Sequence, residues 1–307
     1  MIFRILYGIK DYPINVTSIC LKKCLHNNII FIPKTEHARA TLFTDPLVGT
    51  LKSVFINNTL TGNFYEFTQD KSIYIDLSEN RVYSSLDFQK PIDRLRKIHD
   101  KVKIDFGNID EEYQEQLMSS IFLNGNEKIL EIGSNIGRNS LIIANILNSA
   151  NNSNFVTLEC DPNMYNKLIH NIILNNSSFF AENSALSKRK LIQQGQNTIP
   201  SDVILPEYYS INTIDHSGLI AKYGIQFDTL VLDCEGAFYY ILLDMPEILN
   251  NVNLVLMEND YLNYDHKIFV DSVLKKNNFN VIYLVNDSNA WGFCKDNFWE
   301  VWKRASP

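Results

Sequence analysis

The last two-thirds of the chain alternates short apolar runs with segments whose apolar residues recur at helical spacing. Such alternation predicts an α/β fold with a doubly wound parallel sheet and helices on both faces. The predicted strands end at Glu131, Glu159, Asp233 and Glu258, with another near Phe179, and the predicted helices begin at Arg138, Pro162, Ala237 and Asp265, with another near Gly218.

A further helix is predicted ahead of this pattern, over residues 110–123. Asp110 is expected to cap its N-terminus, and acidic residues fill its first turn. After the last predicted helix, residues 281–285 and 298–302 predict two more strands joined by a polar loop.

The first 85 residues have a different pattern, with strand-like runs separated by Pro, Asn, Asp and Gly. We therefore expect a small β-rich domain over residues 1–85 and a second domain over residues 86–307. A polar stretch that contains Lys34, Glu36 and Arg39 fits either a solvated loop or a surface for a saccharide or partner. The strand-like runs are residues 2–7, 29–32, 53–56, 64–67 and 72–75.

Composition narrows the classes of function. A net charge of −7 and a pI near 5.4 argue against a nucleic-acid partner, which requires a basic face. No apolar run approaches the roughly 18 residues of a membrane span, and the N-terminus lacks the layout of a signal peptide. Five scattered cysteines fit reduced thiols. We expect a cytoplasmic protein without a membrane span.

The richest chemical signal is the turn Glu131-Ile-Gly133-Ser-Asn135-Ile-Gly137, placed between a predicted strand and a helix. Its GxxxG spacing differs from the GxGxxG of dinucleotide sites, and an acid before it favours an ammonium over a phosphate. Glu159 follows about 20 residues later, where a nucleoside-binding fold places the acid for ribose hydroxyls. The two acids predict a ligand with a ribose and an amino acid; the alternative is a helix cap and a surface acid.

These blocks resemble the S-adenosylmethionine-dependent methyltransferases. Asp233-Cys-Glu235-Gly-Ala237 is similar to the D-x-E-G-A signature of the FkbM-type O-methyltransferases, and Ala185-Leu-Ser187 and residues 254–258 resemble other blocks of that family in the same order. The resemblance covers residues 95–307. It implies a Rossmann-like methyltransferase sheet of seven strands with the last one antiparallel.

The resemblance also implies the cofactor and the acceptor. S-adenosylmethionine is the expected cofactor, and a hydroxyl of a sugar or glycan intermediate is the expected acceptor. A polyketide or another small metabolite is an alternative acceptor, and a non-catalytic glycan- or partner-binding module on the same fold is an alternative function. A homo-oligomer is compatible with the sequence. The expected cofactor-binding residues are Glu131, Gly133, Ser134, Asn135, Gly137, Asn139, Glu159 and Asp233.

Methyl transfer to a hydroxyl requires a group that manages the acceptor proton. Asp233, Glu235 and Glu258 follow strands that should be adjacent, so one interpretation makes one of these carboxylates the catalytic base. A second interpretation makes Asp233, Glu258 and Asn259 the ligands of Mg²⁺ or Mn²⁺.

Other residues carry weaker signals. Asp260 is expected to cap the helix near residue 265. His99 and His266 are alternative bases, each with a structural role as the simpler interpretation. Aromatic side chains near the acids are expected to line an acceptor pocket or to join the core. They are Tyr239, Tyr240, Tyr261, Tyr264 and Trp291.

Overall fold

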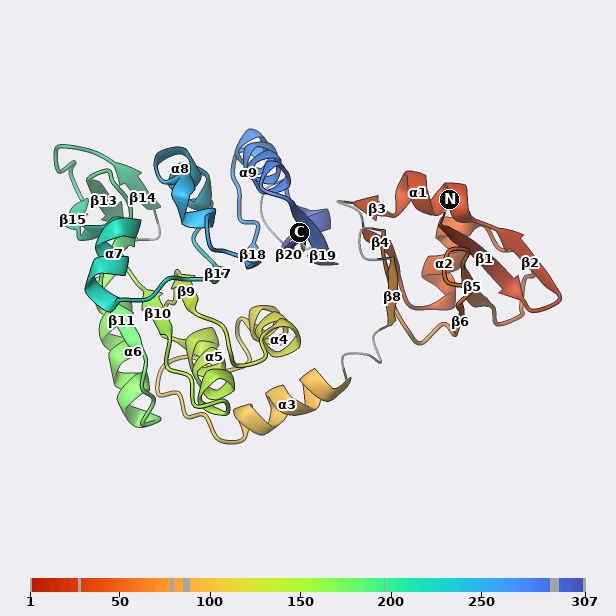
Figure 1. Cartoon of the computed structure of the whole chain (residues 1–307), viewed down its shortest axis with the longest axis horizontal. Helices are drawn as coiled ribbons and strands as arrows, with labels where there is room; N and C mark the ends of the chain where they lie inside the picture. Colours follow the sequence, from red (N-terminus) through yellow and green to blue (C-terminus); the bar gives the residue numbers. More distant parts are fainter. Residues whose placement is uncertain are drawn as a thin grey trace. The chain divides into compact units, whose positions relative to one another are not determined.

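A computed structural model describes residues 2–26, 29–77, 80–84, 89–195, 197–287 and 293–305. The chain forms two compact units, one of residues 1–90 with 280–284 and the other of residues 91–279 with 285–307. Figure 1 shows the elements of both units, each of which is described by itself. The expected domain boundary at residues 85–86 falls outside the described residues and stays a prediction. No described helix combines the length and apolar character that crossing a membrane requires.

The first unit contains two antiparallel sheets around one core. The strand orders are β2-β1-β5-β6 and β3-β4-β7-β8. Alternate residues of β1, namely Phe3, Ile5 and Tyr7, are buried, as expected for a strand with one face on a core. The strands are β1 (Phe3–Ile9), β2 (Tyr12–Asn15), β3 (Leu25–His26), β4 (Ile29–Ile32), β5 (Ser53–Asn58), β6 (Phe64–Phe67), β7 (Ile73–Asp76) and β8 (Arg81–Ser84).

Two helices in this unit differ from the sequence prediction, which gave only strands and loops. They are α1 (Thr17–Lys23) and α2 (Glu36–Phe43). The polar stretch expected to be a loop is α2, and its Arg39 is fully buried. The guanidinium of Arg39 donates hydrogen bonds to the carbonyl oxygens of Pro33, Phe67, Thr68 and Lys71. These bonds compensate the burial of its charge, so Arg39 is a structural residue.

The large sheet has seven strands in the order β11-β10-β9-β17-β18-β20-β19, and all of them except most of β19 belong to the second unit. Neighbouring strands from β11 to β18 are parallel, whereas β20 is antiparallel to β18. This arrangement confirms the predicted doubly wound sheet with its antiparallel last strand. The strands are β9 (Ile129–Ile132), β10 (Phe155–Leu158), β11 (Phe180–Glu182), β17 (Thr229–Leu232), β18 (Leu254–Glu258), β19 (Phe279–Val285) and β20 (Trp299–Arg304).

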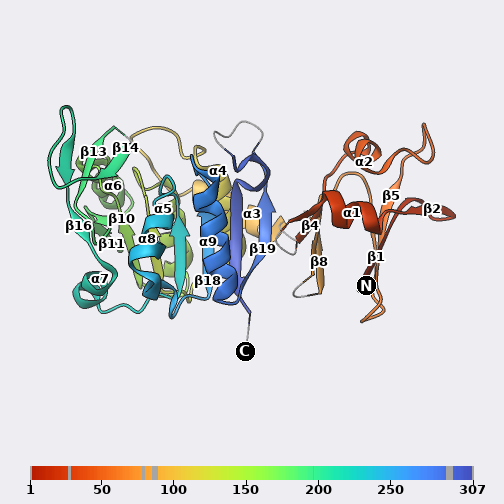
Figure 2. The ribbon, with the colours of Figure 1, turned by 90° about the horizontal axis from the view of Figure 1, so that it is seen from above.

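Helices cover both faces of this sheet. In Figures 1 and 2, α8 and α9 lie on one face, and α4, α5 and α6 lie on the other. Every residue of β9, β10 and β17 is buried, so these strands are mostly apolar in the sequence, with Glu131, Thr157 and Thr229 as buried polar exceptions. The helices are α3 (Gln89–His99), α4 (Tyr113–Phe122), α5 (Arg138–Asn148), α6 (Pro162–Leu174), α7 (His216–Tyr223), α8 (Phe238–Asp244) and α9 (Tyr264–Lys276), with 3-10 turns η1 (Pro246–Leu249) and η2 (Lys295–Asn297).

Two helix starts were predicted incorrectly. Helix α4 begins at Tyr113 with Glu112 at its N-cap, so Asp110 is not the cap. Helix α9 is capped by Asn263, whose side chain accepts a hydrogen bond from the Asp265 amide, and not by Asp260.

Small sheets between β11 and α7 were not predicted. They are a parallel pair and a three-stranded antiparallel sheet of order β14-β13-β15. Their strands are β12 (Ala185–Leu186), β13 (Leu191–Gln194), β14 (Asn197–Pro200), β15 (Tyr209–Ile211) and β16 (Thr213–Ile214).

The direction of the chain through the large sheet reverses at its centre. From β9 it proceeds outward to β10 and β11, and it then returns to the other side of β9 as β17 and β18. In open α/β sheets, a ligand crevice forms at such a switch point, beyond the carboxyl ends of the strands.

Candidate active site

The glycine turn lies at that switch point, between β9 and α5, as predicted. Gly133 has φ of +84°, and a Cβ atom on it would lie 1.7 Å from the carbonyl oxygen of Asp233. The absence of a side chain therefore allows the turn after β9 to approach the turn after β17. Gly137 has φ of +92°, and its missing Cβ leaves room for Leu168 of α6.

Glu131 is almost fully buried within β9. Its carboxylate accepts hydrogen bonds from the side chains of Ser140, Thr157 and, at 3.4 Å, Asn139. Burial raises the pKa of Glu131 to about 7, although the hydroxyl donors favour its ionised form. The residue predicted to meet the amino acid of a cofactor is thus also a link between β9, β10 and α5.

Glu159 follows β10 and is bonded to the glycine turn. Its Oε2 accepts a hydrogen bond from the Asn135 amide at 2.8 Å, and its Oε1 accepts one from the Asp161 amide at 2.8 Å. Burial raises the pKa of Glu159, against the effect of these backbone donors. The structure therefore brings together the two motifs that the sequence places 24 residues apart.

Two other predicted cofactor residues make buried contacts within the protein. The hydroxyl of Ser134 donates to the Leu158 carbonyl at 3.3 Å. The amide oxygen of Asn139 accepts a hydrogen bond from Ser119 at 2.9 Å. Both residues line a small pocket beside Glu131 and Asp233.

The predicted catalytic acids come from two neighbouring strands. Asp233 and Glu235 follow β17, and Glu258 ends β18. Burial and the surrounding carboxylates raise the pKa of Asp233 well above its usual range. A hydrogen bond with Asp260, together with burial, raises the pKa of Glu235 to about 8. Carboxyl groups crowded in this way favour protonation, because each charge disfavours the next.

Glu258 faces Glu115, a residue that no sequence motif indicated. Burial, followed by a hydrogen bond with Glu115 of α4, raises the pKa of Glu258 to about 11. Glu115 is 8% exposed, and its Oε1 accepts a hydrogen bond from the Trp299 indole at 2.7 Å. The Oε2 atom of Glu115 is buried, and among the described residues no N–H or hydroxyl group donates to it.

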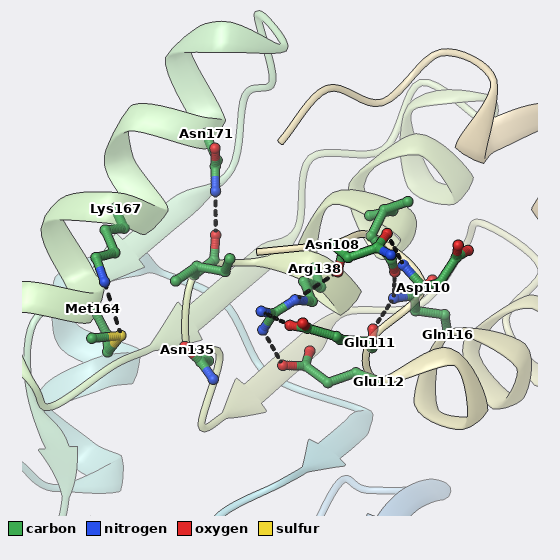
Figure 3. Close-up of polar contacts among 12 residues, drawn as sticks. Asn108, Asp110, Glu111, Glu112, Gln116, Asn135, Arg138, Met164, Lys167 and Asn171 are labelled. Atoms are coloured by element: carbon green, nitrogen blue, oxygen red, sulfur yellow. Dashed lines mark hydrogen bonds and ion pairs between the residues drawn. The ribbon is translucent and has the colours of Figure 1, made fainter. Parts of the chain in front are cut away.

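A second residue outside the prediction, Arg138, follows the glycine turn. Its guanidinium forms ion pairs with Glu111 and Glu112, and it donates to the Asn108 carbonyl at 3.0 Å. Figure 3 shows this guanidinium pointing toward both carboxylates from the start of α5. Burial raises the pKa of Glu112 to about 7 despite this cation. The contact attaches the segment before α4 to the residue that follows the glycine turn.

The acids converge on an open pocket of about 490 Å³. Asn135 and Trp299 belong to its lining, whereas no Lys, Arg or His does among the described residues. A smaller pocket adjoins it and shares Glu112, Glu115 and Asp233. Acidic groups without a neighbouring cation favour a positively charged ligand, because its charge stabilises their ionised forms. The acidic residues lining the large pocket are Glu112, Glu115, Asp233, Glu235 and Glu258.

The structure does not support the predicted metal ligands. Asn259 is fully buried, and its side-chain amide donates to the Asn297 carbonyl at 2.6 Å. It does not line the pocket of Asp233 and Glu258, so the three side chains do not share one site. Among the described residues, no group of three or more His, Cys, Asp and Glu side chains is arranged to hold a metal ion.

The predicted histidines lie away from the pocket lining. His99 is hydrogen-bonded to Gln116 at 2.6 Å, and His266 stacks on Tyr239 with ring centroids 3.7 Å apart. Tyr239, Tyr240 and His266 form an aromatic cluster on α8 and α9, and Tyr261 is buried in the core. Tyr264, at the start of α9, lies near Phe293 rather than in the pocket lining. Trp291 lies outside the described residues.

The sequence matches no protein-family model and no curated protein. Solved structures with similar folds include an O-methyltransferase from Bacillus cereus in complex with SAH, with 14% identity, a TM-score of 0.39 and coverage of 70% of this chain and 91% of the other. The methyltransferase FkbM from Methylobacillus flagellatus has 9% identity and a TM-score of 0.40, covering 71% and 60%. The ribosomal protein L11 methylase from Lactobacillus delbrueckii has 11% identity and a TM-score of 0.38, covering 66% and 82%. Such distant likeness carries no inference about substrate.

Proposed function

We propose that the chain is an S-adenosylmethionine-dependent O-methyltransferase that modifies a hydroxyl of a sugar or glycan intermediate. The observation that carries this proposal is the hydrogen bond between Asn135 and Glu159 at the switch point of the sheet, beside the acidic pocket. It joins the turn expected to hold the methionine portion to the acid expected to hold the ribose. The FkbM-type sequence blocks support the choice of acceptor.

The residues present fit this cofactor. S-adenosylmethionine carries a sulfonium and an ammonium group, which suit a pocket lined by carboxylates and by no cation among its described residues. Each oxygen of Glu159 accepts one backbone N–H, and a carboxylate oxygen has a further lone pair for a ribose hydroxyl. When bound, the cofactor supplies a methyl group on a good leaving group.

The chain supplies a base for the acceptor proton. A base acts best when its pKa lies near the working pH, and the pKa of Glu235, raised to about 8, meets this requirement better than that of Glu258, raised to about 11. Glu235 is exposed and lines the pocket, so an acceptor can reach it. As the acceptor oxygen bonds to the methyl carbon, its proton passes to the Glu235 carboxylate. Asp233 and Glu258 remain candidates for positioning.

Several properties stay predictions. They are the alternative acceptors, namely a polyketide or other small metabolite, the cytoplasmic location, the exclusion of nucleic acid, and a homo-oligomer. A measurement of turnover distinguishes an enzyme from the alternative, a non-catalytic binding module.

The experiment is a mass-spectrometric screen of sugars, glycans and small hydroxyl compounds with S-adenosylmethionine that carries a deuterated methyl group. The label should appear on one acceptor class. Glu235→Gln should retain cofactor binding and lower kcat by about 100-fold or more. Cofactor binding without labelled product across the screen would favour the binding module, and unchanged kcat in the variant would remove Glu235 as base.

A further inference from the structure

Glu115 is the buried carboxylate that the proposed methyl transfer leaves without a role. Helix α4 places it on the wall shared by both pockets, and the Trp299 indole holds its Oε1 at 2.7 Å. More than nine-tenths of the residue is buried, and among the described residues no N–H or hydroxyl group donates to Oε2. A buried carboxylate oxygen without such a donor is destabilising, and a cationic group of a ligand beside it would offset that cost.

Its neighbours make this position rich in carboxyl groups. Glu258 lies within hydrogen-bonding reach of Glu115, and Asp233 and Glu112 line the same pocket. Arg138, at the start of α5, is engaged by Glu111 and Glu112. Two facing carboxyl groups require either a shared proton or a cation between them, because two bare charges repel.

Aromatic side chains accompany the acids. Trp299 and Tyr113 line the pocket together with Glu115 and Glu258. Aromatic faces combined with carboxylates are suited to organic cations, which gain from both the ring quadrupole and the opposite charge. Asn259, the remaining oxygen ligand predicted for a metal ion, does not line this pocket.

We propose that Glu115, held by Trp299, binds an ammonium group of the methyl acceptor, so that the acceptor class is a hydroxyl compound that also carries an amino or quaternary ammonium group. This inference rests on the proposed function, because a methyl acceptor exists only if the chain is a methyltransferase. It implies that phosphate-bearing acceptors are disfavoured by the same pocket.

Binding of a matched pair of probes tests the proposal on the full chain. Choline and its uncharged isostere 3,3-dimethylbutan-1-ol are titrated into protein saturated with SAH, and the Trp299 indole N–H is followed by NMR. Trp299→Phe identifies that signal. Choline should shift the signal and bind at least about tenfold more tightly than the isostere.

Variants then test whether Glu115 causes the preference for choline. Glu115→Gln preserves the shape of the side chain and should reduce the preference for choline to less than about threefold, whereas the matched surface change Glu247→Gln should leave it unchanged. Equal binding of the two probes, an unmoved Trp299 signal, or an unchanged preference in Glu115→Gln would overturn the proposal.

Two further measurements separate the sources of the cation. If Glu115→Gln weakens binding of S-adenosylmethionine but not of SAH, the carboxylate serves the sulfonium and the acceptor proposal is wrong. Repeating the choline titration on unliganded protein keeps the result independent of the cofactor. Absence of any SAH binding would then count against the methyltransferase function and not against the ammonium site.

Discussion

The backbone amide of Asn135 donates a hydrogen bond to Oε2 of Glu159 at 2.8 Å, across the gap between the turn after β9 and the end of β10. This bond fixes the spacing between the two parts of the proposed cofactor site. Glu159 also has a second role, because the same carboxylate accepts a hydrogen bond from the Asp161 amide at the start of α6.

Glu159→Ala should weaken S-adenosylmethionine binding by about tenfold or more, because a charged hydrogen-bond acceptor for the ribose is lost. Calorimetric titration measures this change. The substitution also leaves the Asn135 and Asp161 amides without their partner, so a lower melting temperature should accompany it. A folded variant with unchanged affinity would show that the ribose lies elsewhere.

Gly133→Ala should destabilise the protein by about 3 kcal/mol or more, because the new Cβ would collide with the Asp233 carbonyl and the backbone would have to move. Gly224→Ala is the matched control. Gly224 also has positive φ but has open space around its missing Cβ, so only the conformational cost of about 1–2 kcal/mol applies. Chemical denaturation measures the free energy of unfolding of both variants. Equal losses of stability would mean that the collision at residue 133 is relieved without cost.

The unliganded protein should lose stability as the pH rises from about 5 to 8. Burial raises the pKa of Glu131 from 4.5 to about 7, so the folded state binds a proton that the unfolded state has released. This contribution is complete below pH 4.5 and is lost as the pH passes 7; its full size is about 3 kcal/mol.

Glu131→Gln should flatten this pH dependence without removing it, because the pKa values of Glu112 and Glu235 are also raised. Melting temperatures of both proteins across the pH range provide the measurement. A wild-type melting temperature that rises between pH 5 and 8 would contradict the assignment.

Chelation should leave methyl transfer unchanged. The predicted ligand set loses Asn259, which is fully buried and does not line the pocket of Asp233 and Glu258. Activity after EDTA treatment, with the metal content checked by elemental analysis, tests this expectation. Loss of activity that Mg²⁺ or Mn²⁺ restores would return the metal interpretation, with ligands other than Asn259.

The sequence predicted those parts of the fold that depend on local patterns. Apolar runs and glycines gave β9, β10, β17 and β18, and with them the convergence of Glu131, Glu159 and Asp233. The sequence did not predict helix α2. An Arg in a polar stretch indicates a surface residue, and the four carbonyl groups that accept hydrogen bonds from the buried Arg39 become known only from the structure.

The acidic partner of Glu258 was also missed, for a related reason. Glu115 lies in an ordinary amphipathic helix, and its indole donor, Trp299, is 184 residues away in the sequence. No local pattern reports such a contact. Asn259 directly follows Glu258, but adjacency in the sequence does not place two side chains in one site: Asn259 is fully buried and does not line the pocket of Glu258.

The most direct test of the central claim is a calorimetric titration of the full chain with S-adenosylmethionine. We expect one S-adenosylmethionine site per chain. Binding should be lost or strongly weakened when Glu159 is replaced by Ala, and it should be retained in the surface variant Glu247→Gln. A properly folded chain that gives no binding heat at several temperatures, and no competition between S-adenosylmethionine and SAH, would contradict the assignment of this switch point as a cofactor site.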